Sequence, residues 1–176
     1  LAKLDALVQD VGADRVPYIS LEGNVNMAGG QPFSMANLRE LRAYCDKHDI
    51  PIMLDATRTI ENAWFIRERE EGYADKPVRD ILREICDMTD GCTMSAKKDA
   101  LVNIGGFFCC NDDDVFRKAQ NLVVVYEGLH TYGGMAGRTM EVLARGITAM
   151  VDEGEVHWVM GQNERFTQRL KEAGVP

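Results

Sequence analysis

The sequence predicts an α/β fold, in which a mostly parallel sheet is flanked by helices. Short apolar runs typical of buried strands alternate along the chain with longer stretches whose apolar residues recur at helical spacing. Strand, helix and strand in this order imply parallel strands joined by helical crossovers, with helices on both faces of the sheet. The length of 176 residues suits one domain with a sizeable core.

The elements are placed by periodicity and by the residues that punctuate it. The expected strands cover residues 16–21, 51–54, 91–94 and 106–110. The expected helices cover residues 34–48, 59–71, 77–85, 134–152 and 155–173, with one more after residue 114. Ser34 is a typical N-cap, Pro77 suits a first helical turn, and Gly72 can end a helix. Residues 122–126 fit either a strand or the tail of the helix before them.

Composition and charge exclude several classes of protein. The net charge of -8 argues against nucleic acid as the main partner, because phosphate binding requires a basic surface. No apolar run approaches the roughly 18 residues of a membrane-spanning helix. The 5 cysteines form no CxxC pair, which indicates reduced thiols and a cytoplasmic location.

The two ends of the sequence suggest an internal part of a longer polypeptide. The chain begins with Leu1 rather than Met and stops directly after an expected helix. We therefore expect residues 1–176 to form an incomplete domain, with part of any active site contributed from outside it. On its own, such a chain is expected to be inactive.

The carboxyl ends of the strands are the place to look for a site, because ligands of parallel sheets bind there. Asn26, Asp55 and residues 95–98 all lie just past expected strand ends. Asp55 can be an ordinary helix cap with Arg58 as its ion-pair partner. Alternatively, Asp55 is a carboxylate that pairs with a cationic ring nitrogen, as a pyridoxal cofactor requires.

Lys97 and Lys98 lie between two apolar strands and are followed by a glycine pair. A lysine pair is usually solvated surface. Between buried strands, however, desolvation and the neighbouring like charge would both lower the pKa of an amine, and a neutral amine can attack an aldehyde. The Ser95 hydroxyl and the Lys97 ammonium can meanwhile bind a phosphate.

Four segments together resemble one enzyme family. They read V-N-M-A-G-G-Q-P-F-S-M-A-N, L-D-A-T-R-T-I-E-N-A, G-C-T-M-S-A-K-K-D-A-L-V-N-I-G-G-F and V-V-Y-E-G-L-H-T-Y-G-G-M-A-G-R. These segments resemble the beta-eliminating lyases, the family of tyrosine phenol-lyase and tryptophanase. The resemblance implies the large cofactor-binding domain of the aspartate-aminotransferase type (fold type I), with pyridoxal 5'-phosphate as cofactor and potassium as activating cation. It also implies a homo-oligomer, a tetramer in the family.

The resemblance assigns a role to each matching residue. Lys98 would hold the cofactor as a Schiff base, and Asp55 would pair with its ring nitrogen. The other implied contacts are Arg58 and Asn26 to the phenolic oxygen, Ser95 and Lys97 to the phosphate, Asn103 to the monovalent cation, and Leu129 and Tyr132 to the substrate. If both hold one cofactor, the Asp55 carboxylate and the Lys98 amine should face one cavity, about 5 to 9 Å apart.

The implied reaction is an α,β-elimination on an aromatic L-amino acid, which releases phenol from L-tyrosine or indole from L-tryptophan together with pyruvate and ammonia. The freed Lys98 amine is the expected base, and no residue of this chain stands out as the acid that protonates the leaving group. Two other hypotheses remain open. The chain could belong to an aminotransferase or cysteine lyase of the same fold, or to a non-catalytic scaffold.

Overall fold

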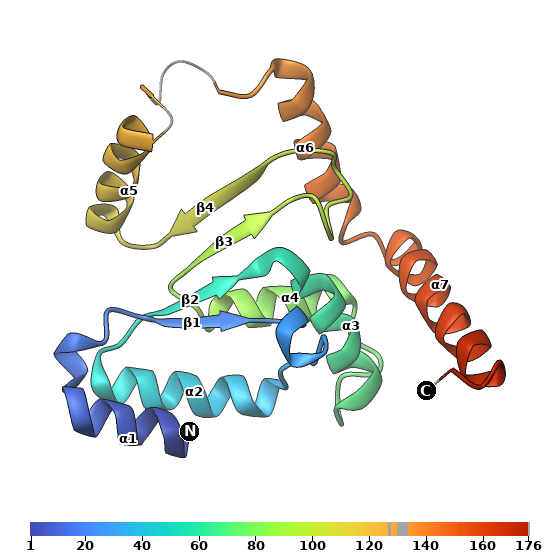
Figure 1. Cartoon of the computed structure of the whole chain (residues 1–176), viewed down its shortest axis with the longest axis horizontal. Helices are drawn as coiled ribbons and strands as arrows, with labels where there is room; N and C mark the ends of the chain where they lie inside the picture. Colours follow the sequence, from blue (N-terminus) through green and yellow to red (C-terminus); the bar gives the residue numbers. More distant parts are fainter. Residues whose placement is uncertain (127, 130–133, 176) are drawn as a thin grey trace.

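The fold is built on a sheet of strands in the order β1-β2-β3-β4. The computed structural model describes residues 1–126, 128–129 and 134–175. The strands are β1 (Ile19–Glu22), β2 (Ile52–Asp55), β3 (Gly91–Ser95) and β4 (Gly106–Cys110). The first three are parallel, and β4 runs antiparallel to β3 (Figure 1). The predicted mostly parallel sheet is thus confirmed, with β4 as its exception.

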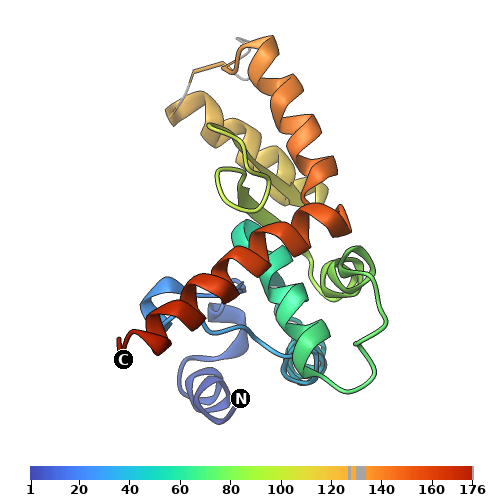
Figure 2. The same ribbon diagram turned by 90° about the vertical axis from the view of Figure 1, so that its right-hand side faces the viewer.

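Helices connect and surround these strands. They are α1 (Ala2–Val11), α2 (Met35–His48), α3 (Thr59–Arg69), α4 (Val78–Asp87), α5 (Asp113–Tyr126), α6 (Gly137–Ala149) and α7 (Glu153–Glu172), with 3-10 turns at η1 (Ala13–Arg15), η2 (Asn26–Ala28) and η3 (Ala56–Arg58). The Ser34 hydroxyl caps α2 as predicted, by accepting a hydrogen bond from the Asn37 N–H at 3.0 Å. Helix α7 crosses α3 and extends away from the sheet (Figures 1 and 2).

One face of the sheet carries the main core. Its buried side chains come from β2, β3 and the helices α2, α3, α4 and α7, and they include Leu38, Leu54, Ile66, Ile81 and Met94. A second cluster joins α1 and α2 to the start of β2. Because strand side chains alternate between faces, Leu54 and Met94 point into this core while their neighbours point away from it.

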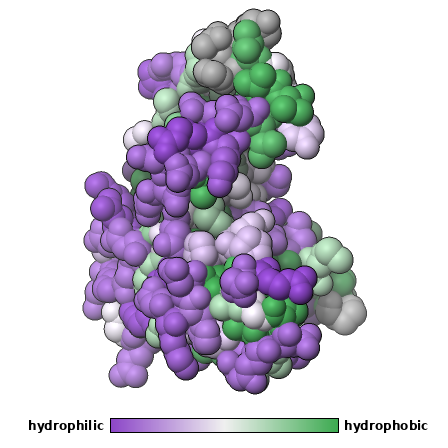
Figure 3. Space-filling view, turned by 90° about the vertical axis from the view of Figure 1, so that its left-hand side faces the viewer, coloured by the Kyte–Doolittle hydropathy of each residue, from purple (hydrophilic) through white to green (hydrophobic). Residues whose placement is uncertain are grey.

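The opposite face is more open in the described part of the chain. Ser20, Glu22 and Thr93 are exposed there, so the expectation of helices over both faces is met for one face only. Helix α5 has no buried residue, and its last five residues, 122–126, are all apolar or aromatic. A hydrophobic patch at the top of the space-filling view corresponds to this end of α5 (Figure 3). Its exposed side chains are Leu122, Val123, Val124, Val125 and Tyr126.

Two segments are defined more closely by these elements than by the sequence. Residues 122–126 are the tail of α5, not a strand. The amino-terminal residues, for which no element was predicted, form α1 and η1. Within the described residues, no helix is long and apolar enough to cross a membrane.

Candidate functional site

Asp55 lies at the carboxyl end of β2, on the open side of the sheet. It is paired with Thr93 in the β2–β3 register, and the pleat turns it away from the face on which Leu54 is buried. Its Oδ1 atom accepts a hydrogen bond from the Thr57 N–H at 3.0 Å. This bond fixes the carboxylate at the start of η3 while the residue stays half-buried.

A chain of hydrogen bonds connects Asp55 with Lys98. The Thr57 hydroxyl, whose own N–H donates to Asp55, accepts a hydrogen bond from the Ser95 N–H at 3.0 Å. The Ser95 hydroxyl in turn accepts one from the Lys98 Nζ at 3.3 Å. Two predicted site residues that are 43 positions apart in sequence are therefore joined through two intermediate residues, Thr57 and Ser95, at one edge of the sheet.

The segment that carries Lys98 is a compact loop between β3 and β4. The Ala96 N–H donates to the Gly105 carbonyl at 3.0 Å, and the Leu101 N–H donates to the Lys98 carbonyl at 2.8 Å. Leu101 has a φ of 54°, a left-handed conformation that is unusual for a residue with a side chain. Helix α6 packs closely on this loop, because a Cβ on Gly146 would lie 2.4 Å from the Ala100 carbonyl oxygen.

A cavity of about 390 Å³ adjoins the Lys98 loop. Arg58, Lys97 and Lys98 line it from the sheet side, and apolar side chains such as Val156 and Met160 of α7 line it from the other. Arg58 and Lys98 are half-buried, whereas Lys97 is exposed. Asp55 is not among the lining residues, so a common cavity for Asp55 and Lys98 stays a prediction.

Other predicted residues lie elsewhere. Asn26 begins η2 and is exposed, and Asn103 is an exposed residue of the Lys98 loop; neither lines the cavity. Leu129 is 47% exposed and is not among the residues that line the cavity. Tyr132 lies outside the described residues. The structure therefore brings together Asp55, Arg58, Ser95, Lys97 and Lys98, and it leaves the other roles untested.

Asp99, directly after Lys98, has the most perturbed carboxyl group around this loop. It accepts a hydrogen bond from the Ile60 N–H at 2.7 Å. Desolvation by burial, followed by the charge of Glu61, raises the pKa of Asp99 to about 7, although the backbone N–H groups of Ile60 and Glu61 and the Arg58 guanidinium act in the opposite direction. Asp99 is thus a titratable group that changes charge near neutral pH, next to the predicted Schiff-base lysine.

Two residues of the candidate site, Thr57 and Asp99, have no role that the sequence alone predicts. Both stand inside the motifs quoted above, next to residues that received one. Their partners are Ser95 and Ile60, which are 38 and 39 positions away. One local signal points to Asp99. The N-cap of α3 is Arg58, whose side chain cannot accept a hydrogen bond, so the first N–H groups of α3 need an acceptor from elsewhere.

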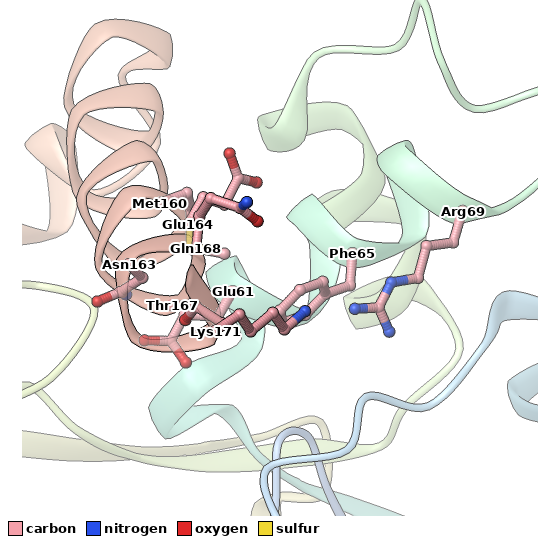
Figure 4. Close-up of a pocket in the computed structure, with 9 residues that line it drawn as sticks. All are labelled: Glu61, Phe65, Arg69, Met160, Asn163, Glu164, Thr167, Gln168 and Lys171. Carbon is pink, nitrogen blue, oxygen red and sulfur yellow. The ribbon is translucent and has the colours of Figure 1, made fainter. Parts of the chain in front are cut away.

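A second cavity, of about 430 Å³, lies between α3 and α7. Phe65 of α3 and Lys171 of α7 extend toward one another across it (Figure 4). Only Glu61 and Met160 also line the cavity at Lys98. None of the predicted site residues lines this second cavity.

Curated proteins with high sequence identity are named tyrosine phenol-lyases. Those of Symbiobacterium sp. (strain SC-1) and Nostoc punctiforme are each 56% identical over 176 residues, and that of Pasteurella multocida is 55% identical over 174. The matches cover 99–100% of this chain but 38% of each relative. The chain therefore spans well under half the length of these curated relatives.

Solved structures support the fold. A crystal structure from Listeria monocytogenes, described as a candidate L-allo-threonine aldolase, superposes with a TM-score of 0.58 at 19% identity over 79% of this chain and 34% of that one. Another, from Exiguobacterium and described as a candidate aromatic amino acid beta-eliminating lyase/threonine aldolase, gives 0.57 at 18% identity over 77% and 34%. The family model of the beta-eliminating lyases matches residues 1–176. The chain belongs to the beta-eliminating lyase family.

Proposed function

We propose that this chain is the cofactor-binding part of a pyridoxal-phosphate-dependent lyase acting on L-tyrosine. The whole protein would convert L-tyrosine and water into phenol, pyruvate and ammonia. The observation that carries the proposal is the hydrogen-bond chain from Asp55 through Thr57 and Ser95 to Lys98. It connects a carboxylate and a primary amine at the edge of the sheet where ligands bind.

The groups present fit the cofactor in their chemistry. An aldehyde needs an amine, a pyridinium nitrogen needs a carboxylate, and a phosphate needs hydroxyl and cationic donors. Lys98, Asp55, Ser95 and Lys97 supply these groups. The Arg58 guanidinium, half-buried at the same edge, can donate to the phenolic oxygen, and we assign Asn26 to that oxygen as well.

The residues of the chain would share the work as follows. Asp55 would hold the ring N–H and keep it protonated. The Lys98 Nζ would bind the cofactor and then, once free, move the proton from the substrate α-carbon. When bound, pyridoxal phosphate supplies an electron sink for the pair left on that carbon. Ser95, whose hydroxyl accepts from Lys98 in the chain as described, would turn to the phosphate.

The proposal also covers the substrate side, the activating cation and the assembly of the whole protein. We assign Leu129 and Tyr132 to the substrate side, and Asn103 to a potassium ion. We also propose residues 1–176 as an incomplete large domain of a cytoplasmic homo-oligomer, a tetramer by family. The acid that protonates the leaving carbon would lie outside this chain. L-Tryptophan, with indole as the product, is the alternative substrate.

The test uses protein made from the longest reading frame that carries this chain. With pyridoxal phosphate and potassium, L-tyrosine should give equal amounts of phenol and pyruvate, and Lys98→Ala should give neither. Lys118→Ala, at an exposed position on α5, is the matched control and should keep full activity. Indole from L-tryptophan without phenol from L-tyrosine would correct the substrate. Release of neither aromatic product would refute the proposed elimination.

A further inference from the structure

Lys98 lies between two hydrogen bonds that connect its loop to the segment between β2 and α3. Three residues before Lys98, the Ser95 N–H donates to the Thr57 hydroxyl at 3.0 Å. One residue after it, the Asp99 carboxylate accepts from the Ile60 N–H at 2.7 Å. Both bonds join a side chain to the backbone, and both span nearly forty residues of sequence. We call this pair of bonds the loop clamp.

The Thr57 bond continues the sheet beyond the point where its backbone ladder stops. The pairing of β2 with β3 ends at Asp55 and Thr93. Ser95 is two residues further along β3, and the hydroxyl of Thr57 provides the acceptor that β2 no longer offers. Because the Thr57 N–H also donates to Asp55, one residue fixes both the carboxylate and the end of the strand that leads to Lys98.

The Asp99 bond supplies α3 with a cap from outside the helix. The residue at the N-cap of α3 is Arg58, whose side chain makes no capping hydrogen bond. A carboxylate at the positive end of a helix makes a stronger bond than a neutral acceptor. Asp99 therefore fastens the backbone directly after Lys98 to the helix that begins directly after Arg58.

Two features of the loop make its hydrogen bonds to the β2–α3 segment important. Leu101 holds a left-handed backbone conformation with its side chain 59% exposed, so this conformation is maintained by the surrounding contacts rather than by burial of its own side chain. Lys97 offers a second amine one residue away from Lys98. A loosened loop would allow either amine to reach the same aldehyde.

We propose that Thr57 and Asp99 are positioning residues that select Lys98, rather than Lys97, as the amine that bonds to the cofactor. The inference rests on the proposed function, since it assumes that this loop meets an aldehyde. Neither residue touches the reacting atoms. They act by holding the backbone on each side of Lys98 against the β2–α3 segment.

The test measures where the cofactor attaches. Protein from the longest reading frame is loaded with pyridoxal phosphate, reduced with borohydride and digested, and mass spectrometry gives the ratio of label on Lys98 to label on Lys97. Thr57→Val keeps the shape of the side chain and removes the acceptor, whereas Thr57→Ser keeps the hydroxyl. Asp99→Ala removes the other acceptor, whereas Asp99→Asn keeps an oxygen there.

Thr57→Val and Asp99→Ala should each lower the labelling ratio about tenfold, the size expected for losing one hydrogen bond. Thr57→Ser and Asp99→Asn should restore most of it. Asp112→Ala is the matched control, because Asp112 caps α5 by accepting from the Asp114 and Val115 N–H groups at 2.7 and 2.9 Å, and it does not line the cavity at Lys98. Its ratio should equal that of the wild type.

An unchanged ratio in both Thr57→Val and Asp99→Ala overturns the positioning role, even if less cofactor binds in total. A wild-type protein that carries no label on Lys98 instead refutes the proposed function. In that case amide hydrogen exchange of residues 96–102, which needs no cofactor, still decides the loop clamp. Exchange should be faster in Thr57→Val and Asp99→Ala than in Asp112→Ala, and equal rates overturn it.

Discussion

Replacing Asp99 by asparagine should stabilise the folded protein above neutral pH. The environment raises the pKa of this carboxyl from 3.8 to about 7, mainly because burial disfavours its charged form. A raised pKa means that the associated stability is complete below about pH 4 and is lost as the pH rises through about 7. The difference of about 3 pKa units corresponds to about 4 kcal/mol. The amide of the Asp99→Asn variant would carry no charge and would avoid that loss.

Burial sets the sign of this effect, and the neighbouring charges partly oppose one another. Glu61 opposes ionisation of Asp99, and Arg58 favours it. Lys97, Lys98 and Glu155 line the same cavity. Burial is the largest cause of the raised pKa, so an uncharged amide should be the more stable group above about pH 7.

Urea unfolding of wild type and Asp99→Asn at pH 5, 6, 7 and 8 measures the effect. Tryptophan fluorescence is a suitable signal, since Trp64 is 5% exposed. The gain in unfolding free energy should grow with pH. Asp112→Asn is a control, because N–H groups at the start of α5 lower the pKa of Asp112 below 3.8, so this variant should be less stable than wild type by a constant amount from pH 5 to 8 and should converge with it only below about pH 4. A gain for Asp99→Asn that is independent of pH would refute the reasoning.

Three further predictions follow from the site and its supports. Lys98→Ala should abolish turnover and borohydride incorporation but keep some non-covalently bound cofactor. Lys97→Ala should keep the covalent bond but hold the cofactor less tightly, and it should shift the pKa of the imine by about one unit in spectral titrations. Glu153→Ala should lower the unfolding free energy by about 1–3 kcal/mol in urea titrations, because Arg67, which is 8% exposed, would lose its acceptor at 2.6 Å, although Glu68 stays at 3.9 Å. Gly146→Ala should cost about 1–3 kcal/mol in the same assay, since the added Cβ would meet a backbone carbonyl of the Lys98 loop at 2.4 Å.

The strands of the sheet were predictable because their apolar runs are bounded by polar or glycine residues. The runs at 51–54 and 106–110 match β2 and β4 to within a residue. The antiparallel direction of β4 was not predicted. The loop of ten residues between β3 and β4 contains no helix, and a parallel connection requires a longer crossover, so the loop length already favoured the antiparallel pairing.

The site was predictable only where chemistry and strand ends coincide. Asp55 and Lys98 follow strands, and their residue types matter to one cofactor. Thr57 and Asp99 could not be found in this way, because their roles depend on contacts with residues 38 and 39 positions away. Periodicity shows which face a residue occupies, but it does not show which backbone group a side chain meets across the sheet.

The loop clamp uses an acid at position 99 where an amide could also accept the hydrogen bond. An asparagine could accept the Ile60 N–H and would avoid the loss of stability at neutral pH, yet the sequence carries the acid. An amide accepts in only one of its two orientations and so holds the clamp less firmly, whereas both carboxylate oxygens are acceptors. Stability given up at a functional site in return for one fixed orientation is a common compromise. If this explanation holds, Asp99→Asn should be the more stable protein at pH 8, and it should recover most but not all of the labelling ratio that Asp99→Ala loses. A ratio equal to that of wild type would mean that any acceptor oxygen suffices, and the acid would then need another explanation.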